Sequence, residues 1–348
     1  MLSRKHATPV YHNENEKEYR GLMTRIGGAM LVFLALFTAT QTAAVAAEPY
    51  LLTFLGETTG TVVSSLLGAG LYFASFMLPV LFFRLISRGK PIESMRLLPR
   101  LPLTAPLLIL AAIGIVLASS TLNSMLLQPF VDGDLLEEIF ADSTDYTKNY
   151  VVVLQFIAIA IVPGICEEFL FRGMILSSLT PYGKTGAVIV SALLFGFMHQ
   201  NPFQMFYATA AGVVLGLMYL YTNSIWCCVI THILNNTLSL VMSVVSARLD
   251  ATTANTVNYA ILGTTFVLSA LSIRALMRIR RREKEGMRTV EDGVFGYIPP
   301  EAEDYMEVPV APARKVRLFF APTIVIFLVL VLLSFVSIML LVTGGITL

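Results

Sequence analysis

Charged residues are scarce in this sequence. Asp, Glu, Lys and Arg make up 14% of its 348 residues, compared with roughly 25% in an average soluble domain. Since 56% of the chain is hydrophobic, the composition excludes a water-soluble globular protein and indicates an integral, multi-pass membrane protein that contacts the lipid bilayer. The net charge of only +1 leaves no broad basic surface for a phosphate backbone, so nucleic acid is not an expected partner.

Cysteine and histidine are scarce as well. The three cysteines, Cys166, Cys227 and Cys228, lie in apolar stretches without the C-x-x-C spacing of a zinc or redox centre, so we interpret them as small apolar residues. The chain has four histidines, and two of these, His199 and His232, also lie in apolar stretches. An ionisable group at membrane depth is costly and commonly functional, so both histidines are candidates for a site.

Long apolar stretches are abundant, and they predict the fold. A helix needs about 20 residues to cross the hydrocarbon core of a bilayer, and most of these stretches reach that length. We therefore predict an all-α, polytopic transmembrane helical bundle with eight or nine spans. The stretches cover residues 26–47, 59–86, 103–127, 150–179, 185–199, 203–222, 224–246, 256–276 and 318–343.

Basic residues fall in alternate loops of this predicted bundle, at residues 84–100, at Lys184 and at residues 274–288. The intervening loops are neutral or acidic, most clearly residues 132–145. Because basic loops tend to remain in the cytoplasm, we predict a protein of the cell membrane with a cytoplasmic N-terminus and an external C-terminus. The polar segment 283–316 is then a cytoplasmic loop, to which we assign no fold.

Two carboxylates and a guanidinium interrupt the apolar stretch at residues 161–174. Glu168 and Arg172 are four residues apart and share a helix face, so they are expected to form an ion pair. Glu167 points away from Arg172, which predicts a desolvated carboxylate without a partner, suited to act as a general base. Pro163, one turn earlier, removes a helical hydrogen bond and favours a kink. The alternative is an Arg–Glu pair that only locks two helices together.

Three further polar residues, His199, His232 and Asn236, are expected at the depth of Glu167. Counted from the predicted cytoplasmic ends, Glu167, His199 and His232 lie ~12 to 21 Å into the membrane at ~1.5 Å per residue. Asn236 shares the helix face of His232, because it follows that residue by four positions. Small residues at four-residue spacing between Ala208 and Gly216 would let the helices approach closely. These positions together predict a buried site.

Water is the best nucleophile for such a site, because no serine, threonine or cysteine has an evident base partner. Glu167 and His199 can deprotonate a water, while His232 and Asn236 can donate hydrogen bonds to the oxyanion of a scissile carbonyl. Alternatively, Glu167, His199 and His232 hold a zinc ion with water as the fourth ligand, although the H-E-x-x-H motif is absent. We favour the metal-free route, because no carboxylate is evident beside either histidine to orient it as a ligand.

The segments EEFLFR at residues 167–172, FGFMH at residues 195–199 and HILNN at residues 232–236 resemble the motifs EExxxR, FxxxH and HxxxN of the CPBP family. This family includes type II CAAX prenyl endopeptidases, bacteriocin-processing proteins and abortive-infection proteins. The resemblance implies an intramembrane endopeptidase, of the glutamate or the metallo type. It implies catalytic roles for Glu167, His199, His232 and Asn236 and supporting roles for Glu168 and Arg172. The implied substrate is a peptide or membrane protein, prenylated or not.

The resemblance divides the chain into three expected parts. Residues 1–149 form an N-terminal cytoplasmic segment with three helices, residues 150–246 form the catalytic helical core, and residues 247–348 form a helix, the polar loop and a last anchor. Two other functions fit the same residues. One is a proton-coupled carrier that uses the polar groups as a relay, and the other is a non-proteolytic membrane partner or bacteriocin-immunity protein of the same family.

Overall fold

The computed structural model describes residues 9–87, 97, 101–127, 144–284 and 310–342. This part of the chain is helical and contains no strand, so the all-α prediction is confirmed. Eight of the described helical segments are long and apolar enough to cross a membrane. The helices are α1 (Pro9–Leu55), α2 (Glu57–Ile86), α3 (Ala105–Leu127), α5 (Asn149–Gln155), η3 (Phe156–Ile161), α6 (Val162–Glu168), η4 (Phe169–Leu176), α7 (Ser177–Leu179), η5 (Thr180–Tyr182), α8 (Lys184–Met198), α9 (Pro202–Thr222), α10 (Ile225–Arg248), α11 (Ala251–Lys284), α12 (Pro312–Phe319) and α13 (Pro322–Val342).

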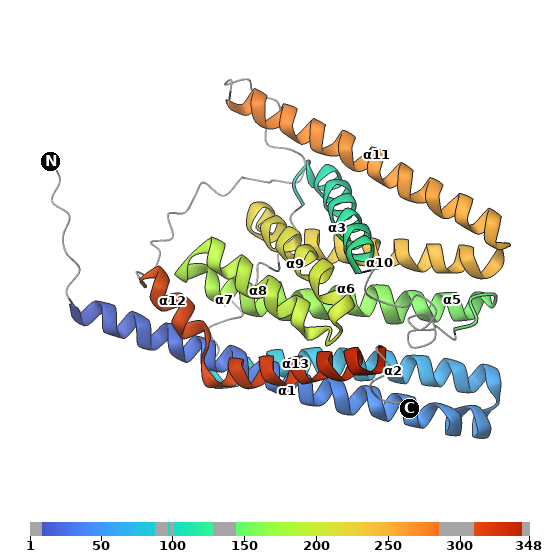
Figure 1. Ribbon diagram of the computed structural model, residues 1–348, viewed down its shortest axis with the longest axis horizontal. Coiled ribbons are helices and arrows are strands. Elements are labelled where there is room, and N and C mark those ends of the chain that lie inside the picture. Colours follow the sequence, from blue (N-terminus) through green and yellow to red (C-terminus); the bar gives the residue numbers. More distant parts are fainter. Residues whose placement is uncertain (1–8, 88–96, 98–100, 128–143, 285–309, 343–348) are drawn as a thin grey trace.

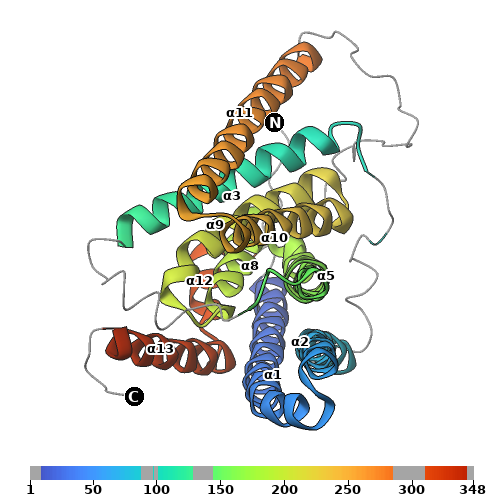
Figure 2. The same ribbon diagram turned by 90° about the vertical axis from the view of Figure 1, so that its right-hand side faces the viewer.

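The bundle has a site-bearing centre with helices packed on two sides (Figures 1 and 2). In Figure 2, α3 and α11 lie together on one side, while α1, α2 and α13 lie on the other. Large apolar side chains such as Val267, Leu271 and Met277 on α11 are exposed, as expected of a surface that contacts lipid. These exposed apolar faces and the spanning helices define an integral, multi-pass membrane protein.

Helix α8 has the same length as the apolar stretch predicted at residues 185–199, but it is too short to cross a membrane. It contains 15 residues, which is about 22 Å of helix and less than the ~30 Å hydrocarbon core. The local sequence explains why α8 ends there. Gln200 adopts a left-handed conformation with φ of 53°, and Asn201 then caps α9, whose first residue is Pro202. The Asn-Pro pair was a sequence signal for this break.

Residues 149–182 form one long apolar helical segment with two π-helical stretches, η3 and η4. Pro163 lies just after η3 and has no N–H to donate to the carbonyl of Ile159, its partner in a regular α-helix. The side-chain amide of Asn236 on α10 donates to that carbonyl at 2.9 Å. A residue from a neighbouring helix therefore donates to a carbonyl to which Pro163 cannot donate.

Close helix crossings occur where the chain has glycine. A Cβ added to Gly164 would lie 2.5 Å from the side chain of Ile233 on α10, and one added to Gly212 would lie 2.8 Å from the Cα of Ala192 on α8. Both contacts are too short for a larger residue. The small residues expected to permit close packing on α9 do so at Gly212, which brings α8 and α9 together beside the ionisable groups.

Two predicted loops fall partly outside the described residues. Of the acidic segment 132–145, the structure describes only residues 144–145. Of the polar segment 283–316, it describes both ends, and each is helical: α11 continues to Lys284 and α12 begins at Pro312. The absence of fold that we predicted for this segment is therefore wrong at both ends, because the flanking helices extend into it.

Candidate active site

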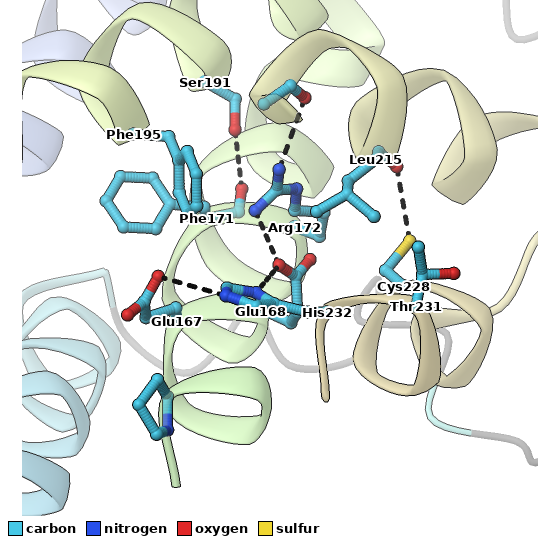
Figure 3. A network of polar contacts seen from close by, with 12 residues as sticks. Glu167, Glu168, Phe171, Arg172, Ser191, Phe195, Leu215, Cys228, Thr231 and His232 are labelled. Atoms are coloured by element: carbon cyan, nitrogen blue, oxygen red, sulfur yellow. Dashed lines mark hydrogen bonds and ion pairs between the residues drawn. The ribbon is translucent and has the colours of Figure 1, made fainter. Parts of the chain in front are cut away.

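Glu168 and Arg172 form the predicted ion pair (Figure 3). Arg172 Nη1 donates to Glu168 Oε1 at 2.9 Å, and both side chains are fully buried. Arg172 Nη2 donates to the carbonyl of Gly212 at 3.3 Å, and its guanidinium carbon lies 4.5 Å from the centre of the Phe195 ring. The arginine thus links the EExxxR segment to α8 and α9 through its charge, a hydrogen bond and a cation–π contact.

His232 lies between the two carboxylates. Its Nδ1 is 2.8 Å from Glu168 Oε1, and its Nε2 is 3.8 Å from Glu167 Oε2 (Figure 3). Because Glu168 is paired with Arg172 and accepts hydrogen bonds, Nδ1 of His232 carries a proton. The expectation that no carboxylate lies beside a histidine was wrong, since Glu168 has the position of an orienting partner.

Glu167 is buried, as expected. The prediction that it has no partner is wrong. The hydroxyl of Tyr72 on α2 donates to Glu167 Oε1 at 2.5 Å. Its other oxygen, Oε2, has no hydrogen-bond partner in the described part of the chain. One carboxylate oxygen is thus fixed by Tyr72, and the second remains available to accept a proton. Tyr72 was missed because it comes from a distant helix, although a phenol in an apolar span normally needs a hydrogen-bond partner.

His199 directly follows α8 as its C-terminal cap. Its Nδ1 lies 2.9 Å from the carbonyl of Phe195, which can only accept, so Nδ1 is the protonated nitrogen and Nε2 is left as the basic atom. The Phe195 ring makes edge contacts with both histidines, at centroid distances of 5.3 Å to His199 and 6.0 Å to His232. Phe195 therefore positions both imidazoles.

The structure brings Glu167, His199, His232 and Asn236 together around one cavity of about 280 Å³. Its wall also includes Tyr207 of α9 and side chains of α3, which lies outside the predicted core of residues 150–246. Glu168 and Arg172 are absent from this lining and lie behind it. The six singled-out residues therefore separate into four that face the cavity and two that support them.

Asn236 was expected to donate hydrogen bonds only to an oxyanion, but it also has a partner in the protein. Its Nδ2 already donates one hydrogen bond to Ile159, whereas the sequence suggested an amide fully available to an oxyanion. An amide nitrogen carries two N–H donors, so one donor remains for a ligand in the cavity. Asn236 thus has a structural partner and a free donor at the same time.

A zinc ion would need Glu167, His199 and His232 to converge. Both histidines have the Nδ1-protonated tautomer that leaves Nε2 for a metal. However, no group of three His, Cys, Asp or Glu side chains among the described residues lies close enough to hold an ion. The chemical type of the donors therefore fits a metal, but their placement does not.

Comparisons with known proteins match the segment of the chain that carries most of this site. Residues 149–238 match the family described as type II CAAX prenyl endopeptidase Rce1-like, which agrees with the resemblance of the three motifs in this segment to the CPBP family. The matched segment contains all six residues singled out from the sequence, but not Tyr72 or α3.

A relative from Bacillus subtilis (strain 168) is named "Putative membrane peptidase YdiL". It is 32% identical over 100 residues, which are 28% of this chain and 40% of the relative. The alignment therefore spans less than half of either protein. No solved structure matches the chain at a comparable level of significance.

Proposed function

We propose that this protein is an intramembrane endopeptidase that hydrolyses peptide bonds with a water activated by Glu167 and His199. The observation that carries the proposal is the single cavity lined by Glu167, His199, His232 and Asn236. Among the described residues no group donates a hydrogen bond to Glu167 Oε2, and the contact of His199 Nδ1 with the Phe195 carbonyl leaves His199 Nε2 as a second proton acceptor. The match of residues 149–238 to a family of endopeptidases supports the same function.

In the proposed reaction, Glu167 Oε2 accepts a proton from water as the water oxygen attacks the scissile carbonyl carbon. Tyr72 holds the other oxygen of Glu167, so the carboxylate stays aimed at the cavity. The tetrahedral intermediate then collapses as the C–N bond breaks. The leaving nitrogen takes the proton from Glu167, directly or through His199, and the products are an amine and a carboxylic acid, whose remaining proton then passes to the amine to give an ammonium and a carboxylate.

His232 and Asn236 are the proposed donors to the oxyanion. Since Nδ1–H of His232 is directed at Glu168, His232 can donate from Nε2 only as an imidazolium, so the proposed oxyanion role requires that form. Asn236 adds the N–H that is not bonded to Ile159. Removing one oxyanion donor typically costs about 10²- to 10³-fold in rate.

The proposed substrate is a peptide or membrane-protein segment that enters from the bilayer or its surface. Prenylated CAAX peptides are the first class to test, because of the family that residues 149–238 match. Unprenylated membrane peptides are the second class. The gathering of the ionisable groups around one cavity supports hydrolysis more than a proton-coupled carrier, which would need them along a path across the membrane.

The test is a cleavage assay with the purified full-length protein in lipid nanodiscs. Prenylated and unprenylated versions of one peptide are incubated with wild-type protein and with Glu167→Gln, and products are identified by mass spectrometry in H₂¹⁸O. Cleavage with one ¹⁸O in the new carboxyl, absent in Glu167→Gln, is expected. Binding of the peptides without cleavage would instead support a non-proteolytic partner.

The metal-dependent alternative is separated by a second arm of this assay. Chelator-treated protein is assayed beside untreated protein, and zinc is measured in both samples. The proposed route predicts that activity is retained after chelation. Stoichiometric zinc whose loss and return track activity would replace the Glu167-activated water by a metal-bound water.

A further inference from the structure

A basic cavity lies at the junction of α1 and α12, on a part of the molecule that does not line the peptidase cavity. Its volume is about 430 Å³. Residues one turn apart on α12, Arg314 and Arg317, face it from one side, while Glu16 and Arg20 of α1 face it from the other. Three guanidinium groups and one carboxylate therefore surround the same space.

The charges in this basic cavity do not balance. Arg314 forms an ion pair with Glu16, so those two charges offset each other. In the described part of the chain, the guanidinium groups of Arg20 and Arg317 have no hydrogen-bond or ion-pair partner. Two unpaired arginines that converge on a cavity offer the geometry in which guanidinium groups bind phosphate.

An apolar groove adjoins the basic cavity and is bounded by residues of α12 and α8. It has a volume of about 330 Å³ and is lined by apolar side chains that include Ala187, Val190 and Phe319. Phe320 lines both the basic cavity and the apolar groove. At the edge of the groove, Lys315 donates a hydrogen bond to the carbonyl of Tyr182. This bond joins α12 to the C-terminal end of the helical segment 149–182, which carries Glu167.

We propose that the basic cavity and the apolar groove together bind one anionic phospholipid. The phosphate contacts Arg20 and Arg317, and an acyl chain follows the groove past Phe320. The position supports this assignment, because α12 directly precedes the spanning helix α13, and basic residues beside a span attract anionic headgroups. A free phosphate ion would use the basic cavity but leave the apolar groove without a role.

The experiment measures lipid retention by native mass spectrometry of the full chain, titrated with phosphatidylglycerol or phosphatidylcholine. Wild-type protein is expected to retain one phosphatidylglycerol in preference to phosphatidylcholine. The double variant Arg20→Gln/Arg317→Gln is expected to lose affinity for phosphatidylglycerol about 30-fold, and each single variant about fivefold. Thermal unfolding of each variant verifies that it is folded.

Two controls separate this site from its alternatives. Arg274→Gln/Arg278→Gln removes the same charge from α11, so an equal loss of affinity there would show non-specific attraction and overturn the proposal. Phe320→Ser alters the apolar groove while leaving both arginines, and is expected to weaken phosphatidylglycerol but not inorganic phosphate. If inorganic phosphate displaces the lipid and Phe320→Ser has no effect, the site binds a free anion, and the lipid proposal fails.

Discussion

Glu167 and Glu168 are neighbours in the chain, yet their partners differ, and substitution should separate them. Glu167→Gln keeps an oxygen that can accept from Tyr72, so we expect abolished turnover with stability changed by less than about 1 kcal/mol. Glu168→Gln leaves Arg172 buried without a counter-charge, and a loss of about 3 to 5 kcal/mol is expected. Thermal unfolding and cleavage are measured on both. Equal stability losses would contradict the assignment of partners.

Tyr72 is expected to act as a positioning residue for Glu167. Tyr72→Phe keeps the aromatic contacts with Phe37 and Phe76 but removes the hydroxyl. Hydrogen bonds to charged groups contribute about 1.5 to 3 kcal/mol, so we expect kcat to fall about 10- to 100-fold with little change in KM or melting temperature. Tyr259→Phe, at an exposed ring on α11, is the matched control. A drop in melting temperature that accounts for the lost activity would show a structural role instead.

At the residue scale, the sequence could predict contacts between residues of the same helix, because their spacing determines which side chains share a face. The Glu168–Arg172 pair follows from a four-residue separation, and it is confirmed. The hydrogen bond between Tyr72 and Glu167 joins residues 95 positions apart, and the contact between His232 and Glu168 depends on how α10 rotates against α6. Neither could be deduced from periodicity, because helix rotation is fixed by packing between segments.

At the scale of the element, Pro163 and Asn236 should be energetically coupled. Asn236→Leu leaves the carbonyl of Ile159 without its donor, which should cost about 1 to 3 kcal/mol. In a Pro163→Ala background, residue 163 regains an N–H that can bond the same carbonyl, so Asn236→Leu should cost less. A double-mutant cycle on unfolding measures this coupling. Additive effects would show that Asn236 does not compensate for the proline.

At the scale of helices, two features could not be predicted from hydropathy: that α8 does not span, and that two stretches are π-helical. Hydropathy identified every long helix, because spanning length is a simple count of apolar residues. It placed α8 to within one residue but counted it among the possible spans, although 15 residues are too few and Gln200 and Pro202 impose the turn that ends the helix. The π-helical stretches leave no mark in hydropathy, because they change hydrogen-bond register without changing composition.

At the scale of the whole molecule, the charge pattern predicts orientation. A reporter inserted at Gly56, between α1 and α2, is expected to be accessible from outside, and one at Gly183, before α8, from the cytoplasm. Accessibility to a membrane-impermeant thiol reagent, after a cysteine is placed at each position, measures this. A cytoplasmic Gly56 would reverse the proposed orientation of the bundle and the side from which substrate approaches.

The contact between α1 and α13 should depend on one glycine. A Cβ at Gly27 would lie 2.6 Å from the backbone nitrogen of Ile324 on α13, so Gly27→Ala should destabilise the protein by about 1 to 3 kcal/mol. Gly28→Ala is the matched control, because its Cβ would meet only Phe82 at 3.8 Å, and the gain in helix propensity should leave it neutral or slightly stabilised. Equal melting temperatures for the two variants would contradict the packing of α13 on α1.

The same contact has a consequence for biosynthesis. Glu16 and its partner Arg314 are separated by 298 residues, and the hydroxyl of Thr323 bonds the carbonyl of Thr24 across a similar distance. At 5 to 20 residues per second, translation of the intervening chain takes roughly 15 to 60 s. During this time the surface of α1 that α12 and α13 later cover is exposed to lipid or to the insertion machinery. The family-matched segment, residues 149–238, is thus synthesised before α1 acquires its last neighbours.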